Sequence, residues 1–214
     1  MAMGWYERVV FRRAMDAVLG QPEVHAERVE ALAHARGAIL EVGIGTGLNL
    51  PAYPDSVTAI KALTLEAALD PRAAARAAER GIAISLVSGD AERMPFDDET
   101  FDTVACTFLL CSVGDPSAVV REARRILRPE GRLLFMEHVA YVAPGKRAIQ
   151  RVLDPVSRVV SCGCSLVRES ASTIADAGLQ IEELVDLHLP AMTWPHRRVI
   201  RGVATRGSAP LATR

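Results

Sequence analysis

The sequence has few cysteines, and their spacing does not match the common metal or redox motifs. Its 214 residues include four cysteines, too few for the disulfide framework of a small secreted protein. Cys162 and Cys164 form a C-x-C pair, whereas structural zinc and thioredoxin-type sites use C-x-x-C. A site drawing on cysteine and histidine stays an alternative, but the spacing does not favour it, and we expect no bound metal.

Two further absences narrow the class of protein. The formal net charge is -1, so there is no basic excess that would attract nucleic acid. No apolar run approaches the roughly 18 residues that span a bilayer, and the N-terminus lacks the pattern of a cleaved signal peptide. We therefore expect a soluble, cytoplasmic protein that has no membrane anchor and does not bind nucleic acid.

What the sequence does contain is an alternation of strand and helix patterns. Half of the residues are hydrophobic, enough for one domain with a substantial core. Asp-Pro pairs at 70–71 and 115–116 are helix start signals, and Gly81 is a stop signal. We expect an α/β, doubly wound, Rossmann-like fold: a mostly parallel sheet with a closing antiparallel strand and helices on both faces. The expected strands are 38–42, 60–65, 82–87, 101–108, 132–136, 180–187 and 199–204, and the expected helices are 5–19, 24–34, 71–80, 116–128 and 170–177.

A glycine-rich segment follows the first expected strand. Residues 39–50 read ILEVGIGTGLNL, with Gly43, Gly45 and Gly47 alternating after an apolar run. Glycine accepts positive φ and lets the backbone approach a ligand closely, and a helix that follows aims its free N–H groups at the same place. The spacing differs from the G-x-G-x-x-G dinucleotide pattern, and no lysine follows as in a phosphate-binding loop. The segment predicts a cofactor loop without naming the ligand.

Polar residues follow the other expected strands. In an open parallel sheet, the ligand binds outside the carboxyl ends of the strands. Carboxylates at these ends can accept hydrogen bonds from the hydroxyls of a ribose or from the amino group of an adenine. The strand ends present Glu41 to Gly47, Glu66, Asp90 to Glu92, Cys106 with Thr107, and Glu137 with His138.

Several motifs occur in a defined order along the chain. They are EVGIGTG at 41–47, an acid after the second strand, GDAE at 89–92, MPF at 94–96, FD at 101–102 and LRPEGR at 127–132. This order resembles that of class I S-adenosylmethionine-dependent methyltransferases. CTFLLCSV at 106–113, FMEHVA at 135–140 and CGCSLVRE at 162–169 are similar to the methyltransferase-like branch that includes alkyl-thiol methyltransferases. Animal members of that branch carry an N-terminal membrane anchor that this sequence lacks, so we do not carry membrane association over.

The resemblance implies S-adenosylmethionine as the methyl donor, S-adenosylhomocysteine as the product, and one domain over 1–214. Within it, 1–36 would form a helical cap, 37–140 the cofactor-binding core and 141–214 the substrate-side lid with the closing strands. Glu66 would accept hydrogen bonds from the ribose hydroxyls, and Asp90 would accept one from the adenine amino group. Asp70, the competing acid after the second strand, is explained as a helix N-cap. The expected cofactor set is Glu41, Gly43, Gly45, Thr46, Gly47, Asn49, Glu66, Asp90, Ala91, Glu92 and Thr107.

The acceptor side of the site is specified less closely. Transfer from a sulfonium requires alignment and exclusion of water, and a base only if the acceptor arrives protonated. His138 is the candidate base, with a structural role as the alternative. The expected substrate-side residues are Tyr6, Cys106, Tyr141, Cys164 and Trp194, with core packing as the alternative.

We expect a small-molecule acceptor, with a thiol or another soft, apolar nucleophile favoured. One alternative is quinone-pathway or natural-product methylation on oxygen, carbon or nitrogen. Another is a non-catalytic cofactor-binding regulator or partner subunit. The oligomeric state has no signature in the sequence.

Overall fold

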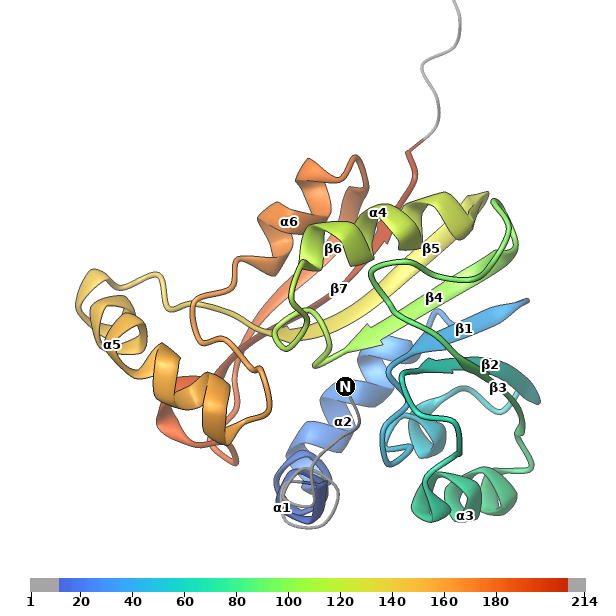
Figure 1. The fold of residues 1–214 in the computed structure, drawn as a ribbon, viewed down its shortest axis with the longest axis horizontal. Helices are drawn as coiled ribbons and strands as arrows, with labels where there is room; N and C mark the ends of the chain where they lie inside the picture. The colour runs from blue at the N-terminus through green and yellow to red at the C-terminus, as the bar shows by residue number, and fades with distance from the viewer. Residues whose placement is uncertain (1–11, 208–214) are drawn as a thin grey trace, which may run out of the picture.

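The computed structural model describes residues 12–207, and its centre is a seven-stranded sheet of order β3-β2-β1-β4-β5-β7-β6. Strands β1 to β5 pair in parallel, and β7 runs antiparallel to both β5 and β6 (Figure 1). This confirms the predicted mostly parallel sheet with one closing antiparallel strand. The strands are β1 Ile39–Val42, β2 Ala59–Thr64, β3 Ala83–Ser88, β4 Phe101–Thr107, β5 Leu127–His138, β6 Gln180–His188 and β7 Arg198–Thr205.

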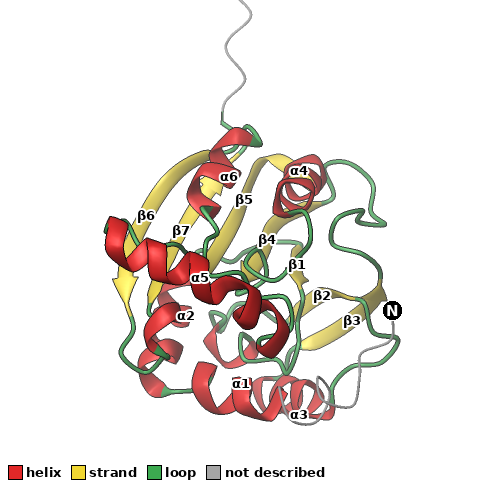
Figure 2. Ribbon diagram, turned by 60° about the vertical axis from the view of Figure 1, so that its left-hand side comes forward, coloured by secondary structure: helices red, strands yellow, loops and turns green. Residues whose placement is uncertain are grey.

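Helices cover both faces of the sheet, as predicted (Figures 1 and 2). Helices α4 and α6 pack on one face, and α2 and α3 contribute buried residues to the other. The α-helices are α1 Arg12–Leu19, α2 Pro22–Leu32, α3 Pro71–Arg80, α4 Pro116–Ile126, α5 Pro144–Val160 and α6 Ser170–Asp176, and two short 3-10 helices are η2 Leu50–Ala52 and η3 Trp194–His196.

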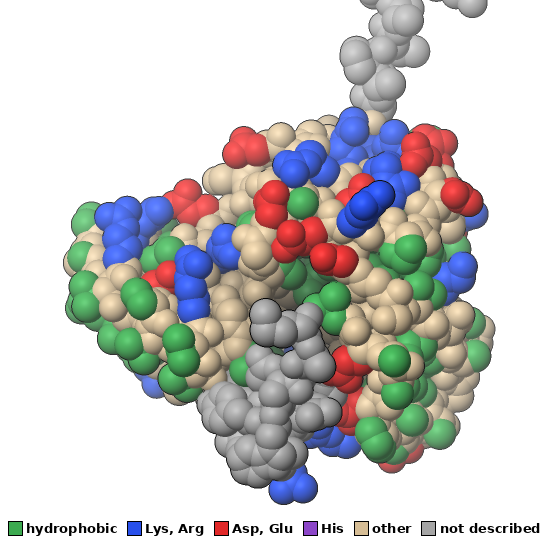
Figure 3. All heavy atoms as spheres, in the orientation of Figure 1, with side chains coloured by type: hydrophobic (Ala, Val, Ile, Leu, Met, Phe, Trp, Pro, Cys, Tyr) green, Lys and Arg blue, Asp and Glu red, His purple; other side chains and the backbone are tan. Residues whose placement is uncertain are grey.

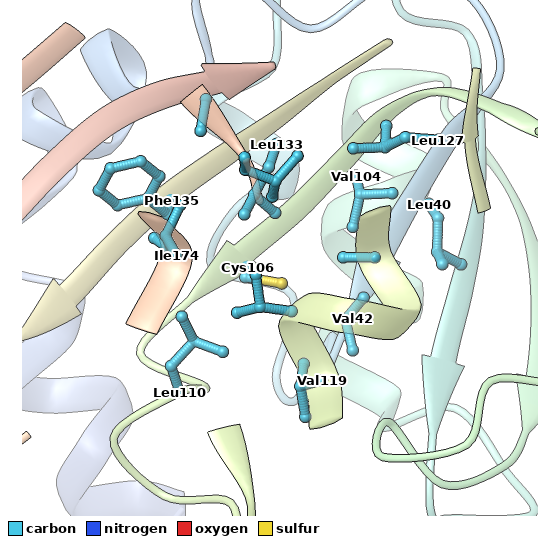
Figure 4. Packing of buried hydrophobic residues seen from close by; sticks show 14 of the residues in the cluster. Leu40, Val42, Val104, Cys106, Leu110, Val119, Leu127, Leu133, Phe135 and Ile174 are labelled. Carbon is cyan, nitrogen blue, oxygen red and sulfur yellow. The ribbon is translucent and has the colours of Figure 1, made fainter. Parts of the chain in front are cut away.

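The largest buried cluster lies between the central strands and α4. Val104, Cys106 and Phe135 point from β4 and β5 towards Val119 of α4 and Ile174 of α6 (Figure 4). All five side chains are at most 1% exposed. Strands β4 and β5 are covered on both faces. Each therefore contains a continuous apolar run, 104–106 in β4 and 133–136 in β5, as is typical of buried parallel strands.

The predicted start and stop signals of two helices are confirmed. Asp70 accepts a hydrogen bond from the Arg72 backbone N–H at 2.9 Å and caps α3, which ends at Gly81 with φ +65°. Asp115 caps α4 through the Ala118 N–H at 3.1 Å. These caps fix where α3 and α4 begin, and therefore where the loops before them lie at the edge of the sheet.

Helix α5 is a 17-residue helix that the sequence pattern did not predict. Pro144 and Gly145 lie at its start and Pro155 lies inside it, and proline and glycine disfavour a helix interior. Figure 1 shows α5 set apart from the sheet, and Val152 and Val159 are each 78% exposed. Its apolar residues do recur at helical spacing, but this stripe, which includes Val152, Val156 and Val159, is exposed rather than buried.

Candidate active site

The glycine loop between β1 and η2 has the backbone that its sequence predicts. Gly43, Gly45 and Gly47 have φ values of +76°, +52° and +80°. A Cβ at Gly47 would lie 2.8 Å from the Ala73 Cα of α3, whereas a Cβ at Gly45 would meet no atom closer than 3.8 Å. Gly47 is therefore required for packing between the loop and α3, and Gly45 faces open space at the carboxyl edge of the sheet.

A buried polar network lies beneath this loop. The Asn49 amide donates to Glu41 Oε1 and the Tyr53 hydroxyl donates to Glu41 Oε2, both at 3.1 Å. Asn49 Oδ1 in turn accepts from Arg28 Nε at 2.7 Å and from the Thr107 hydroxyl at 3.1 Å. Glu41, Asn49 and Thr107 are thus brought together as a support for the loop, and their contact with a cofactor stays a prediction.

Sequence reasoning missed Arg28 and Tyr53, which complete the network. Burial raises the pKa of Glu41 to about 7, against the opposing effects of Tyr53, Asn49 and Arg28. Burial likewise lowers the pKa of Arg28 to about 10, although the Glu41 carboxylate opposes the shift. Arg28 comes from α2 and is 2% exposed. It lies four residues after Val24 and four before Leu32, so its place on the apolar face of the helix was a sequence signal of an acidic partner.

Glu41 makes the stability of the fold depend on pH. The folded protein releases the Glu41 proton near pH 7 and the unfolded chain near pH 4.5, so the folded state binds more protons between these values. We therefore expect this residue alone to lower the free energy of unfolding by roughly 2 to 3 kcal/mol as pH rises through that window. Urea denaturation at about pH 5 and about pH 8 measures the change.

Glu41→Gln is the matched variant for this experiment. It keeps the shape of the side chain, removes the titration, and loses one hydrogen bond from Tyr53 or Asn49 at every pH. The variant should therefore show a flatter pH dependence than the wild type, and the difference in stability between the two proteins should be larger at about pH 5 than at about pH 8. Parallel pH profiles for the two proteins would contradict a raised pKa at Glu41.

Thr46, predicted to contact the cofactor, is tied to α1. Its hydroxyl donates to Asp16 Oδ1 at 2.5 Å, and its carbonyl accepts from Arg76 at 2.6 Å. Burial by itself would raise the pKa of Asp16, but hydrogen bonds from Arg76 and Thr46 lower it below the usual value. Helix α1 is thereby fixed against the glycine loop, which the sequence did not predict beyond a helical cap.

The predicted ribose acid lies just beyond the end of β2. The strand ends at Thr64, two residues before Glu66, and Glu66 is half-buried with its backbone N–H donating to the Thr64 hydroxyl at 3.3 Å. The competing Asp70 is 9% exposed and accepts hydrogen bonds from Arg72 as the cap of α3. The cap role assigned to Asp70 is confirmed, and ribose binding by Glu66 stays a prediction.

The predicted adenine segment follows β3. Asp90 is exposed and its carboxylate accepts the Glu92 backbone N–H at 2.9 Å, as in a tight turn. Ala91 is half-buried against the core, and Glu92 Oε1 accepts the Asp115 N–H at 2.9 Å. Glu92 therefore joins this turn to the start of α4, while the Asp90 residue is exposed.

The candidate base lies against two thiols. His138 ends β5, is 8% exposed, and has its Nδ1 atom 3.6 Å from Cys111 Sγ and 3.5 Å from Cys164 Sγ. Its ring also packs against Phe108 and His196, with centroids 4.8 Å and 5.1 Å apart. The structure thus places the predicted Cys164 beside His138 and adds Cys111, a residue that the sequence motif contained without a role.

The other substrate-side candidates lie in different surroundings. Tyr141 and Trp194 stack with centroids 5.8 Å apart and an interplanar angle of 20°, and the Tyr141 hydroxyl donates to the Trp194 carbonyl at 3.0 Å. Cys106 is 1% exposed in the core cluster, where burial raises the pKa of its thiol well above the usual value. That surrounding matches the alternative of core packing. Tyr6 lies outside the described residues.

Charged side chains do not separate into large areas of one sign on the face drawn in Figure 3. Over the described residues of this face, acidic and basic side chains lie side by side. In residues 12–207, no helix has the length and apolar character that crossing a bilayer requires.

Comparisons with known proteins agree with this geometry. The family described as "Methyltransferase domain" matches residues 40–135, from β1 to β5. The thiol S-methyltransferase TMT1B of Homo sapiens is 32% identical over 181 residues, which cover 78% of this chain and 70% of that protein. The phosphatidylethanolamine N-methyltransferase of Cereibacter sphaeroides is 36% identical over 129 residues, or 59% of this chain and 63% of that protein.

A solved structure shares the fold. Geranyl diphosphate methyltransferase in complex with SAM superposes with a TM-score of 0.64 and 20% identity, covering 89% of this chain and 94% of that one. The shared fold thus accompanies the sequence relationship to the thiol S-methyltransferases. On these grounds, the chain belongs to the S-adenosylmethionine-dependent methyltransferases.

Proposed function

We propose that the protein transfers a methyl group from S-adenosylmethionine to a small-molecule thiol. The observation that carries the choice of acceptor is the 32% identity to thiol S-methyltransferase TMT1B over 78% of the chain. The stacked pair Tyr141 and Trp194, both beyond the carboxyl end of β5, supports an apolar acceptor. S-adenosylmethionine, when bound, supplies an electrophilic methyl group on a sulfonium.

The residues at the carboxyl edge of the sheet fit this cofactor. Gly45 leaves open space where its positive φ aims the loop backbone outward, so the loop amides would bind the methionyl carboxylate. Glu66 and Asp90 follow the neighbouring strands β2 and β3 and would accept the ribose hydroxyls and the adenine amino group. The buried network of Glu41, Asn49 and Arg28 would hold the loop in place rather than move during the reaction.

Substrate residues would mainly orient the acceptor and exclude water. Displacement at a sulfonium removes charge, so alignment of the thiol with the methyl group contributes more than stabilisation of a new charge. The thiolate is the reactive form, and a free thiol has a pKa of about 8.5, so a modest preference of the site for the thiolate is sufficient. His138 stays a predicted base for this proton.

A second acceptor class has specific support. The phosphatidylethanolamine N-methyltransferase relative, at 36% identity, favours an amine as the alternative, although it matches only 59% of this chain.

Two measurements test the proposed function. Isothermal titration calorimetry with S-adenosylmethionine and S-adenosylhomocysteine tests cofactor binding, and the formation of S-adenosylhomocysteine from S-adenosylmethionine in the presence of an acceptor tests turnover. Turnover of an alkyl thiol supports the proposal, and turnover of an amine or a quinol without thiol activity rejects it. Cofactor binding without turnover of any acceptor would favour the alternative of a non-catalytic cofactor-binding regulator or partner subunit.

The two acids near the end of β2 give a matched pair for the cofactor site. Glu66→Ala should weaken S-adenosylmethionine binding at least about 10-fold, because the loss of a charged partner for two hydroxyls costs more than about 1.4 kcal/mol. Asp70→Ala should cost about 1 kcal/mol of stability through the lost cap of α3, with a smaller effect on binding. Calorimetry and thermal unfolding of both variants separate the two effects. A larger binding loss in Asp70→Ala would show that the ribose acid is misassigned.

A further inference from the structure

Cys111, His138 and Cys164 form a cluster of three metal-ligating side chains. The Cys111 and Cys164 sulfurs lie 3.6 Å and 3.5 Å from His138 Nδ1, and the three atoms all lie within 4.8 Å of one another. The residues are 1%, 8% and 5% exposed. They come from the loop after β4, the end of β5 and the loop after α5, so only the folded chain brings them together.

The surroundings of His138 Nδ1 suit a cation. The Cys111 thiol hydrogen-bonds to Cys164 as well as to His138, and its Sγ lies 3.5 Å from the Ser112 hydroxyl. A neutral imidazole nitrogen has either one proton or one lone pair, so Nδ1 completes one good hydrogen bond, whereas both thiols lie within 3.6 Å of it. A tetrahedral zinc ion with Zn–S of about 2.3 Å and Zn–N of about 2.05 Å holds sulfur and nitrogen roughly 3.5 Å apart. Both sulfur-to-nitrogen separations in the cluster match this distance, and one cation would contact all three atoms.

Backbone contacts hold the two cysteine loops together. The Ser165 N–H donates to the Cys111 carbonyl at 2.8 Å, and the Ser157 hydroxyl donates to the Cys164 carbonyl at 3.0 Å. Between the two cysteines of the C-x-C segment, Gly163 has φ +96°, and a Cβ there would lie 2.6 Å from the Ser112 carbonyl oxygen. The ligand atoms are thus positioned by contacts that do not themselves involve the sulfurs, as in a preorganised metal site.

We propose that Cys111, His138 and Cys164 bind a zinc ion that keeps its fourth position open for a thiolate. Among residues 12–207, the cluster contains no fourth cysteine, histidine or carboxylate. His196 lies beside His138, but its two ring nitrogens contact the Ser157 and Thr193 hydroxyls at 3.3 Å and 2.9 Å. Three protein ligands with one open position are typical of catalytic zinc, and cysteine with histidine selects zinc over harder cations.

The open position gives the acceptor a binding mode. An alkyl thiol would bind through its sulfur and release its proton to solvent, and zinc-bound thiols are deprotonated at neutral pH. His138 would then serve as a ligand, and no base would be needed. This part of the proposal rests on the proposed thiol function, whereas zinc binding by the three residues does not.

Zinc binding is tested on the full chain, reduced and freed of metal with a chelator. Competition with a chromogenic chelator should give one zinc per chain, and Cys111→Ser and Cys164→Ser should each bind at least about 100-fold more weakly. Cys162→Ser, in the same loop but outside the cluster, is the matched control and should bind like the wild type. Circular dichroism of each variant verifies that it is folded.

Cobalt substitution provides a second measurement. The wild type and Cys162→Ser should show a thiolate-to-cobalt charge-transfer band that Cys111→Ser and Cys164→Ser reduce. Failure to bind zinc, equal affinity in all four proteins, or a Cys111–Cys164 disulfide in freshly reduced protein would overturn the site.

The acceptor part has its own readout. Adding an alkyl thiol to the cobalt protein should change the charge-transfer band, and the corresponding alcohol should not. An unchanged spectrum would overturn the open thiolate position even if zinc binds. Zinc binding and the spectral change with no methyl transfer to any thiol would instead reject the proposed function and leave the metal site standing.

Discussion

Replacing Glu137 with alanine is expected to lower the free energy of unfolding by roughly 3 to 6 kcal/mol. Glu137 is fully buried, and its carboxylate accepts the backbone N–H groups of Leu109 and Leu110 at 2.9 Å and of Cys111 at 3.2 Å. Truncation leaves three buried donors without an acceptor, each costing about 1 to 3 kcal/mol unless water enters the cavity. Since domains are stable by about 5 to 15 kcal/mol, the loss would be a large fraction of the total stability.

Glu137→Gln is the control that separates the hydrogen bonds from the volume of the side chain. Its carbonyl can still accept from Leu109 and Leu110, but its NH2 group would face the Cys111 N–H, donor against donor. The loss should therefore be clearly smaller than in the alanine variant. Urea denaturation measures both, and equal losses would show that the three backbone donors do not stabilise this loop.

The second large effect is expected at the glycine loop, where neighbouring glycines have different surroundings. Gly47→Ala should cost roughly 3 to 4 kcal/mol, because a side chain at φ +80° is strained and its Cβ overlaps the backbone of Ala73 in α3. Gly45→Ala has the strain of a positive φ without the overlap and should cost about 1 to 2 kcal/mol. Thermal or urea unfolding distinguishes the two variants.

The same pair separates folding from cofactor binding. If the open space at Gly45 receives the cofactor, Gly45→Ala should weaken S-adenosylmethionine binding at least about 10-fold while the protein stays folded. Calorimetry on Gly45→Ala is the measurement. Binding as tight as in the wild type would show that the cofactor lies elsewhere along the loop.

Local signals predicted the elements that local chemistry determines. The Asp70 and Asp115 caps, the Gly81 stop and the three positive φ values of the glycine loop all follow from residue type at a given spacing. The strand alternation was sufficient for a mostly parallel sheet with a closing antiparallel strand, but not for the spatial order of the strands or the insertion of β7 between β5 and β6. The ends of some strands differ from the prediction. Strand β2 ends at Thr64 rather than at residue 65, and β5 begins at Leu127 rather than at residue 132, after Gly131.

What the sequence could not show depends on contacts between distant residues. Arg28 reaches Asn49 from a different helix, and Cys111 and Cys164 are 53 positions apart and meet at His138 only after folding. The spacing of the C-x-C pair gives no indication of this cluster, since Cys162 is not in it. Helix α5 is a different case: its apolar residues recur at helical spacing, but Pro144, Gly145 and Pro155 disfavour a helix.

The position of β7 has a consequence for synthesis of the chain on the ribosome. Strand β7 is nearly the last element made, yet it lies between β5 and β6 and pairs with Leu133 and Phe135 of β5. Until residues 198–205 emerge, β5 is an edge strand, and its unpaired backbone N–H and C=O groups, flanked by apolar side chains, can pair with another chain. A nascent or truncated chain that ends before β7 is therefore at the greatest risk of aggregation, and chaperones that shield hydrophobic strands would act at this stage.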